Sequence, residues 1–347
     1  MKQRIAAFAF VCLLLTGIGA LVRDHLLPQR SAPERPADLS EVSGDLALAR
    51  IRSGPYLVFR NTLHGAGYGR VALASLDAPL ERYVTGLACE RVYFAGGTGV
   101  CLTADRGVVT TYAARIFDSA FRPGPEIPLS GPPSRARVSP DGSLAAFTVF
   151  ESGHGYDSPH FSTRTTIVDA ATSTPIAHLE EFDVVRDGAP FREQDFNFWG
   201  VTFADGDRFY ATLATGGRIF LVEGSVRERR LRVLRDGVEC PSLSPDGRRI
   251  AFKSRRLEGG RLVWGIRVLD LETGTETALD GEARNFDDQA AWLDPDHVLY
   301  GMPEARVPAT GGSDVWQIAV RKGSEPELVL AQASSPGVVR PAAAAVR

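Results

Sequence analysis

The sequence predicts an all-β fold, and three observations support this prediction. The motif SPDG occurs at residues 139–142 and again at 244–247, each time followed at once by a short apolar stretch. Weaker copies of the same turn and strand occur at residues 204–211 and 294–300. The matching aspartates recur at roughly the 40 to 50 residue period of a four-stranded blade, once one longer insertion is allowed for. The repeat therefore predicts a β-propeller.

The composition of the repeated motif is that of a tight turn. Proline presets φ at the first corner, aspartate bonds back to the local backbone, and glycine tolerates a positive φ. We therefore expect the motif residues to shape the blades and not to bind a ligand. These turn residues are Pro140, Asp141, Gly142, Asp205, Gly206, Pro245, Asp246, Gly247, Pro295 and Asp296.

The motif resembles that of the TolB-like, WD-repeat-like propeller family, whose blades carry S-P-D-G-x-x-I-A-F between their first and second strands. Two copies in this chain match closely and two match in part, all between about residues 132 and 300. The resemblance implies a ring of about six blades over residues 54–332 that serves as a binding scaffold. In the family, catalysis is uncommon unless another domain is attached.

Short apolar stretches bounded by turns divide the chain into six expected blades. Rings of five blades, with one irregular insertion, or of seven blades remain alternatives. Blade boundaries are expected at residues 54–85, 86–130, 132–182, 195–235, 236–281 and 282–332, within a propeller domain at 47–335. The segment 336–347 is rich in Pro and Ala without a core pattern, so we expect a disordered tail.

The N-terminus differs from the rest of the chain. Lys2 and Arg4 precede an apolar run at residues 5–22, and a Pro-rich linker is expected at 26–46. Residues 1–25 are thus predicted to be a membrane anchor or a signal peptide. The pattern favours an uncleaved single-pass anchor in the cell membrane, with the propeller outside the cytoplasm. The alternative is a cleaved signal that leaves a periplasmic or secreted protein.

Composition restricts the function classes. The formal net charge is −3 without a basic stripe, which argues against nucleic-acid binding. Lysine occurs only at Lys2, Lys253 and Lys322, which indicates a GC-rich bacterial source. Cys89 and Cys101 flank a Gly-rich hairpin, so we predict a disulfide, with two buried free thiols as the alternative. Cys240 is expected to be a packed free thiol.

In this blade pattern the second-to-third loops and the links between blades share one face, opposite the SPDG turns. Long segments are expected there at residues 61–68, 151–162, 183–197, 255–261, 281–289 and 302–313. Such loops concentrate binding residues. The binding-face candidates are His64, His154, Tyr156, Asp157, His160, Asp187, Phe191, Arg192, Glu193, Asp195, Asp287 and Asp288. We expect Phe191 and Arg192 to be exposed, Phe198 and Trp199 to be core, and Asp287 and Asp288 to be a solvated pair.

These features predict a non-catalytic, membrane-tethered extracytoplasmic scaffold that binds a protein, peptide or envelope component. We expect a monomer without cofactor or bound metal. No nucleophile elbow, phosphate loop or dinucleotide fingerprint occurs in the chain. One alternative is a metal-dependent propeller enzyme of the lactonase or lyase type, in which His154 and His160 hold the metal. The other is a small-ligand sensor.

Overall fold

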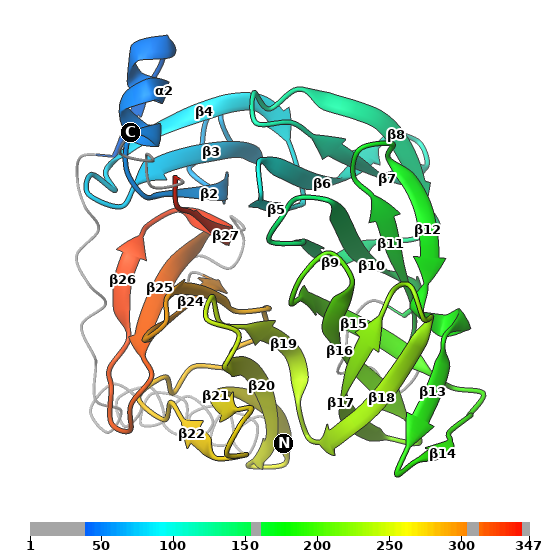
Figure 1. Ribbon diagram of the computed structural model, residues 1–347. Helices are drawn as coiled ribbons and strands as arrows, with labels where there is room; N and C mark the ends of the chain where they lie inside the picture. Colours follow the sequence, from blue (N-terminus) through cyan, green and yellow to red (C-terminus); the bar gives the residue numbers. More distant parts are fainter. Residues whose placement is uncertain (1–38, 154–160, 304–311, 342–347) are drawn as a thin grey trace, which may run out of the picture. The chain divides into compact units, whose positions relative to one another are not determined.

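The computed structural model describes residues 39–153, 161–303 and 312–341. These residues belong to one compact unit in which six mainly antiparallel sheets are arranged in a ring; we call the region around its axis the channel (Figure 1). The sheets are the blades, named A to F in chain order. The predicted all-β propeller with six blades is confirmed.

The first three blades are listed from the channel outward. Blade A consists of β27 (Ala333–Val339), β2 (Tyr56–Asn61), β3 (Arg70–Ser75), β4 (Glu81–Ala88) and β1 (Ser40–Val42). Blade B consists of β5 (Arg91–Ala95), β6 (Thr98–Arg106), β7 (Thr110–Phe117) and β8 (Pro123–Leu129). Blade C consists of β9 (Pro133–Val138), β10 (Leu144–Ser152), β11 (Ser162–Asp169) and β12 (Thr174–His178).

The remaining blades follow the same order. Blade D consists of β15 (Asn197–Phe203), β16 (Arg208–Thr215), β17 (Arg218–Ser225), β18 (Arg230–Asp236), β13 (Asp183–Arg186) and β14 (Ala189–Pro190). Blade E consists of β19 (Glu239–Leu243), β20 (Arg249–Glu258), β21 (Arg261–Asp270) and β22 (Glu276–Ala278). Blade F consists of β23 (Ala291–Asp294), β24 (His297–Pro303), β25 (Ser313–Ala319) and β26 (Glu327–Leu330).

The ring is closed by the end of the chain. β27 pairs antiparallel with β2, so the inner strand of blade A comes from the C-terminal part of the sequence. Residues 336–339 are therefore in a strand, whereas the sequence predicted a disordered tail from 336 onward. The fully buried guanidinium of Arg82 donates to the carbonyls of Ala331 (2.9 Å) and Gln332 (3.1 Å), just before β27. Burial lowers the pKa of Arg82 to about 10.

The expected linker is also shorter than predicted at its C-terminal end. β1 pairs in parallel with β4, and helix α2 (Asp45–Arg52) follows it. In the part of the chain that the structure describes, no helix is long and apolar enough to span a membrane. The predicted anchor at residues 1–25 lies outside the described residues.

Blade D contains an addition that the sequence pattern did not predict. Instead of a long loop at 183–197, β13 and β14 form a hairpin whose first strand pairs in parallel with β18. Phe191 follows this hairpin and packs edge-to-face on Phe220, at 6.1 Å between ring centroids. It is half-buried and not exposed as predicted, because the added hairpin carries it against the core of blade D. Phe198 and Trp199 are fully buried, as predicted.

Candidate functional site

The SPDG turns form the face of the ring that we call the turn face. In blade C the Ser139 hydroxyl donates to the Asp141 carboxylate at 2.5 Å and accepts from the Leu144 N–H at 2.9 Å. The turn of blade E repeats this arrangement with Ser244, Asp246 and Arg249. Gly142 and Gly247 have φ angles of 74° and 72°, which glycine adopts without strain. Each turn therefore satisfies its own polar groups.

In the two weaker copies of the motif, a carboxylate also accepts hydrogen bonds from the N–H groups of its own turn, but without the serine. Asp205 accepts hydrogen bonds from the N–H groups of Asp207 (2.9 Å) and Arg208 (2.7 Å). In blade F the capping carboxylate is Asp294, which accepts from the Asp296 N–H at 2.7 Å. Asp296 itself is exposed and lies 3.3 Å from the Arg249 guanidinium of blade E. The turn role predicted for Asp296 thus belongs to Asp294.

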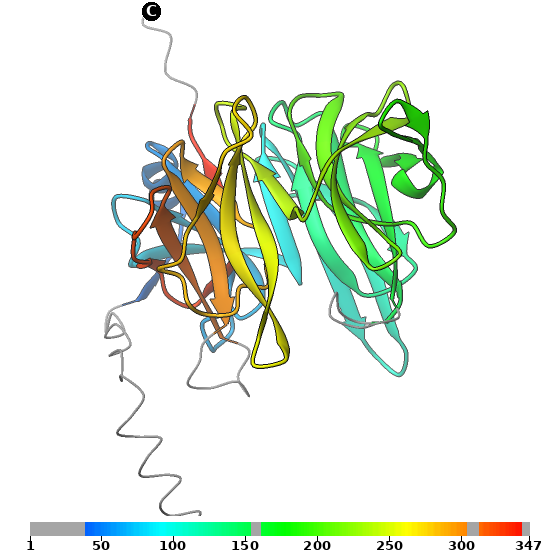
Figure 2. The ribbon, with the colours of Figure 1, turned by 90° about the horizontal axis from the view of Figure 1, so that it is seen from below.

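The opposite face, which we call the loop face, carries the second-to-third strand loops and the connections between blades. Figure 2 shows the β6–β7 and β20–β21 hairpins projecting from this face at well-separated points of the ring. Their tips expose apolar side chains: Val108 and Val109 in blade B, and Leu257 in blade E, which is 77% exposed. Exposed aliphatic groups at such positions are available for contact with a partner.

The predicted disulfide is confirmed. Cys89 and Cys101 are bonded, with their Cα atoms 5.4 Å apart. The bond ties the link between blades A and B to β6. Cys240 is a buried free cysteine, as predicted, and burial raises the pKa of its thiol.

Most of the predicted binding residues that the structure describes do not lie together. His64 is exposed in the β2–β3 loop, with its ring 5.8 Å from that of Tyr68. Asp195 accepts from the Gly216 N–H at 2.8 Å and also from the Thr215 hydroxyl; these hydrogen bonds lower its pKa. Three exposed candidates lie within or just after the β13–β14 hairpin, whose strands are the outermost of blade D: Asp187, Arg192 and Glu193. Four candidates lie outside the described residues: His154, Tyr156, Asp157 and His160.

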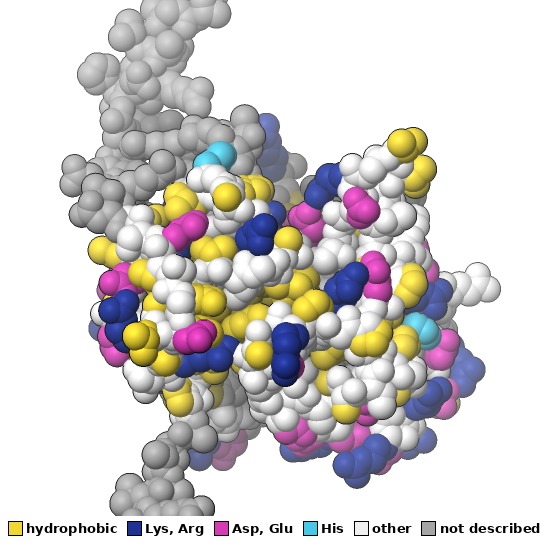
Figure 3. Space-filling view, turned by 90° about the horizontal axis from the view of Figure 1, so that it is seen from above, with side chains coloured by type: hydrophobic (Ala, Val, Ile, Leu, Met, Phe, Trp, Pro, Cys, Tyr) yellow, Lys and Arg dark blue, Asp and Glu magenta, His cyan; other side chains and the backbone are white. Residues whose placement is uncertain are grey.

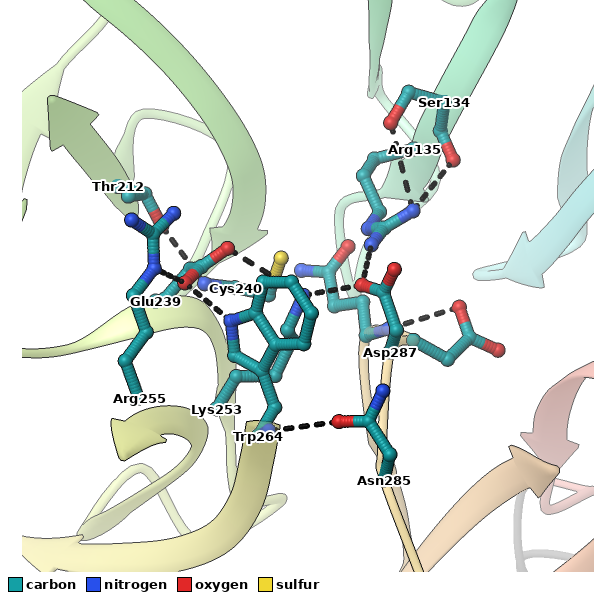
Figure 4. A network of polar contacts seen from close by, with 12 residues as sticks. Ser134, Arg135, Thr212, Glu239, Cys240, Lys253, Arg255, Trp264, Asn285 and Asp287 are labelled. Carbon is teal, nitrogen blue, oxygen red and sulfur yellow. Dashed lines mark hydrogen bonds and ion pairs between the residues drawn. The ribbon is translucent and has the colours of Figure 1, made fainter. Parts of the chain in front are cut away.

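The predicted residue that the structure places in a cluster is Asp287. Its carboxylate forms an ion pair with the ammonium of Lys253, which has no exposed surface, and lies 3.5 Å from the Arg135 guanidinium (Figure 4). Asp288 is 3.4 Å from the Arg91 guanidinium. The expected solvated pair is thus wrong: both carboxylates meet cations at the loop-face end of the channel.

Glu239 supplies the second carboxylate of the Lys253 site. Only 1% of its side chain is exposed, and its Oε1 lies 3.4 Å from Lys253 Nζ. Its Oε2 accepts from Arg255 at 2.7 Å and from the Trp264 indole at 2.9 Å (Figure 4). The Lys253 ammonium also lies 4.4 Å from the centre of the Trp264 ring. Lys253, Glu239, Asp287, Arg135, Arg255 and Trp264 are together called the channel cluster.

The charged side chains of the channel cluster are stabilised by oppositely charged partners on other strands. Burial alone would raise the pKa of Asp287, but the cations Lys253 and Arg135 outweigh burial and hold that pKa below its usual value. Buried charges are costly unless they are paired, so this arrangement depends on all partners being present.

A hollow adjoins the channel cluster between blades D and E. Its volume is about 280 Å³, and the Arg255 and Glu239 side chains form part of its wall. The other lining residues are Arg218, Ile219, Asp236, Gly237 and Ser254. The loop face thus offers a recess beside a charged channel mouth.

Sequence reasoning missed most of the channel cluster, although some signals were present. Lys253 is one of three lysines in the chain and follows the apolar stretch after the second SPDG motif. Arg135 and Arg137 alternate on the strand before the first SPDG motif, at spacing that places both on one side of the strand. No local pattern marks Glu239 or Trp264, because their partners come from elsewhere in the sequence.

Two observations bear on other functions. Among residues 39–153, 161–303 and 312–341, no three His, Cys, Asp or Glu side chains gather as a metal site would require. On the side of the molecule in Figure 3, acidic and basic side chains are interspersed, without the continuous basic stripe that nucleic-acid binding uses.

No family model matches the chain. No curated protein matches it either. Among solved structures, TolB from Acinetobacter baumannii is similar with a TM-score of 0.54 and 16% identity, over 83% of this chain and 67% of that one. A chain of a Nidogen/Laminin complex is similar with a TM-score of 0.55 and 10% identity, over 82% of this chain and 98% of that one. The chain is a six-bladed β-propeller. At these identities the likeness shows the fold alone.

Proposed function

We propose that this protein is a non-catalytic, TolB-like scaffold, tethered to the cell membrane outside the cytoplasm, that binds a protein or peptide of the envelope through its loop face. The observation that carries the proposal is the channel cluster. Its charges come from blades C and E and from the connection before blade F, and all meet at the loop-face end of the channel. The strand pairing that closes the ring, between β27 and β2, belongs to blade A and not to this cluster.

The surroundings of the cluster support a macromolecular partner. The hollow between blades D and E and the exposed tips at Val108, Val109 and Leu257 lie on the same face as the channel cluster. Protein-binding surfaces combine apolar anchors with a few buried polar groups in this way. On the turn face, the described carboxylates Asp141, Asp205 and Asp294 are instead bonded within their own turns.

Site-specific photo-crosslinking tests the proposal. A crosslinking amino acid is placed at Leu257 on the loop face of the full chain in its native membrane, and the matched control is placed at Asp296 on the turn face. Leu257 should give one discrete crosslinked envelope protein or peptide, and Asp296 should not. Equal products from both faces, or none from Leu257 and from a second probe at Val108, would refute the assigned face.

The alternative of a metal-dependent enzyme has a separate test. Metal analysis of the purified full chain is expected to show no stoichiometric divalent metal. A bound metal that is lost when His154 and His160 are changed to Ala would favour the enzyme over the scaffold.

A further inference from the structure

The channel contains a second polar site beside the channel cluster, lined by the inner strands of blades A, B and C and by the connection before blade F. It is a small pocket with a free volume of about 20 Å³, so it admits only a small head group. Its polar lining residues are Arg91, Tyr93, Ser134, Arg135, Arg137, Asp288, Gln289 and Ser335. We call it the channel pocket.

Arg137 gives the channel pocket its positive charge. The side chain is 8% exposed and donates to the backbone carbonyls of Ala136 at 3.1 Å and Ala290 at 2.5 Å. The guanidinium also lies 4.4 Å from the centre of the Tyr93 ring. Among the described residues, no carboxylate forms an ion pair with it. A desolvated guanidinium held by neutral acceptors favours a nearby anion.

The acid that the pocket contains is already engaged. Asp288 lies 3.4 Å from Arg91 and also accepts from the Gln289 N–H at 2.8 Å. Its side chain is 14% exposed, so solvent screens it little. The positive charges of Arg91 and Arg137 therefore face one carboxylate. An additional anion in the pocket would interact with both guanidiniums.

The side chain of Gln289 indicates that the ligand also carries a hydrogen-bond donor. Its Nε2 donates to the carbonyls of Val201 (3.0 Å) and Pro241 (2.8 Å), which fixes the orientation of the amide. Its Oε1 is buried and accepts no hydrogen bond from any described group. Gln289 is therefore a lining residue with an acceptor that lacks a donor among the described groups, in a pocket with an excess of positive charge. A peptide carboxylate provides both a negative head and an adjacent N–H group.

We propose that the channel pocket binds a single carboxylate of a peptide, either an Asp or Glu side chain or a chain terminus, through Arg91 and Arg137. This inference deepens the proposed function, since it names the chemical group that the scaffold recognises in its partner. The small volume selects one carboxylate head and excludes a nucleotide or a sugar ring.

Thermal unfolding of the full chain, with calorimetric titration, tests this proposal. The probes are N-acetylglycine, acetate and inorganic phosphate, each against chloride at equal ionic strength. We expect N-acetylglycine to raise Tm most, because it has both the carboxylate and the N–H, and acetate to raise it less. Arg137→Met should weaken N-acetylglycine binding about tenfold or more, while Arg122→Met, an exposed arginine of the β7–β8 turn, should leave it unchanged.

The results separate the alternatives. If Arg137→Met does not fold, Arg91→Gln at the edge of the pocket should give the same weakening. A larger effect of phosphate than of N-acetylglycine overturns the carboxylate assignment, and no effect of any probe, or an unchanged affinity in both arginine variants, overturns the site. If Leu257 crosslinks to a partner but no probe binds, the carboxylate site is refuted and the scaffold function stands. If a probe binds but Leu257 gives no crosslink, the carboxylate site stands and the proposed loop-face scaffold function is refuted.

Discussion

The turn face and the loop face of this propeller satisfy their polar groups in different ways. On the turn face, Asp141 and Asp246 bond to serine hydroxyls and backbone N–H groups within the same short turn. On the loop face, Asp287 pairs with Lys253 of blade E and lies near Arg135 of blade C. Local satisfaction makes a turn that can be repeated in every blade. Polar groups that are paired across blades form a site that the repeat does not reproduce.

The largest effect on stability is expected from removing Lys253, because the buried charges on the loop face are paired with one another. Lys253→Met would leave Glu239 buried and Asp287 without its ammonium partner, which should lower the free energy of unfolding by roughly 3 to 5 kcal/mol. Urea unfolding of the variant and wild type measures the loss. Arg192→Met, whose ion pair with Asp183 is exposed, serves as the control and should change stability by less than about 1 kcal/mol. A Lys253 variant as stable as wild type would contradict the interdependence.

The disulfide tests how strongly the join between blades A and B depends on a covalent tie. It closes a loop of 12 residue positions, so replacing both Cys89 and Cys101 with Ser should cost about 3 kcal/mol. Urea unfolding under oxidising and reducing conditions measures this. In reductant, the urea midpoint of the wild type should approach that of the double variant. The midpoint of Cys240→Ser should still fall when reductant is added. A wild type whose midpoint does not respond to reductant would refute the prediction.

A matched pair of glycines tests the local character of the turn face. Gly142 and Gly247 occupy the same motif position at nearly the same φ, but a Cβ at Gly142 would lie 2.5 Å from the Gly96 carbonyl oxygen, whereas nothing lies within 4 Å at Gly247. Gly247→Ala should cost about 1 kcal/mol for the left-handed backbone, and Gly142→Ala clearly more because the neighbouring turn must move. Urea unfolding of the two variants and the wild type measures the two losses in free energy of unfolding. Equal losses would show that the turns do not pack against each other.

A further test concerns the pH dependence of stability at a buried carboxyl group. Burial raises the pKa of Glu180, between blades C and D, to about 8. Its protonated form is favoured in the folded state, so stability should be highest below about pH 4.5 and fall progressively as the pH rises to about 8. Glu180→Gln should remove this decline and Glu181→Gln, on an exposed neighbour, should not. Identical pH profiles for the two variants would argue against it.

The pH response of the loop face has the opposite sign. The pKa of Asp287 is lowered by its cations, so its contribution is present above the ordinary aspartate pKa and is lost as the pH falls through the lower folded value. A stability profile over pH 2 to 9 thus distinguishes the Asp287 contribution from that of Glu180.

The sequence by itself determined the repeating part of this protein. The SPDG turns, the six blades, the Cys89–Cys101 bond and the burial of Phe198 and Trp199 were predictable, because each depends on neighbouring residues or on alternation along one strand. Only the tertiary structure decided that β27 closes blade A, that β13 and β14 extend blade D, and that Lys253, Glu239 and Asp287 meet in the channel. Those contacts join residues from separate strands and connections, and their geometry exists only once the ring has closed.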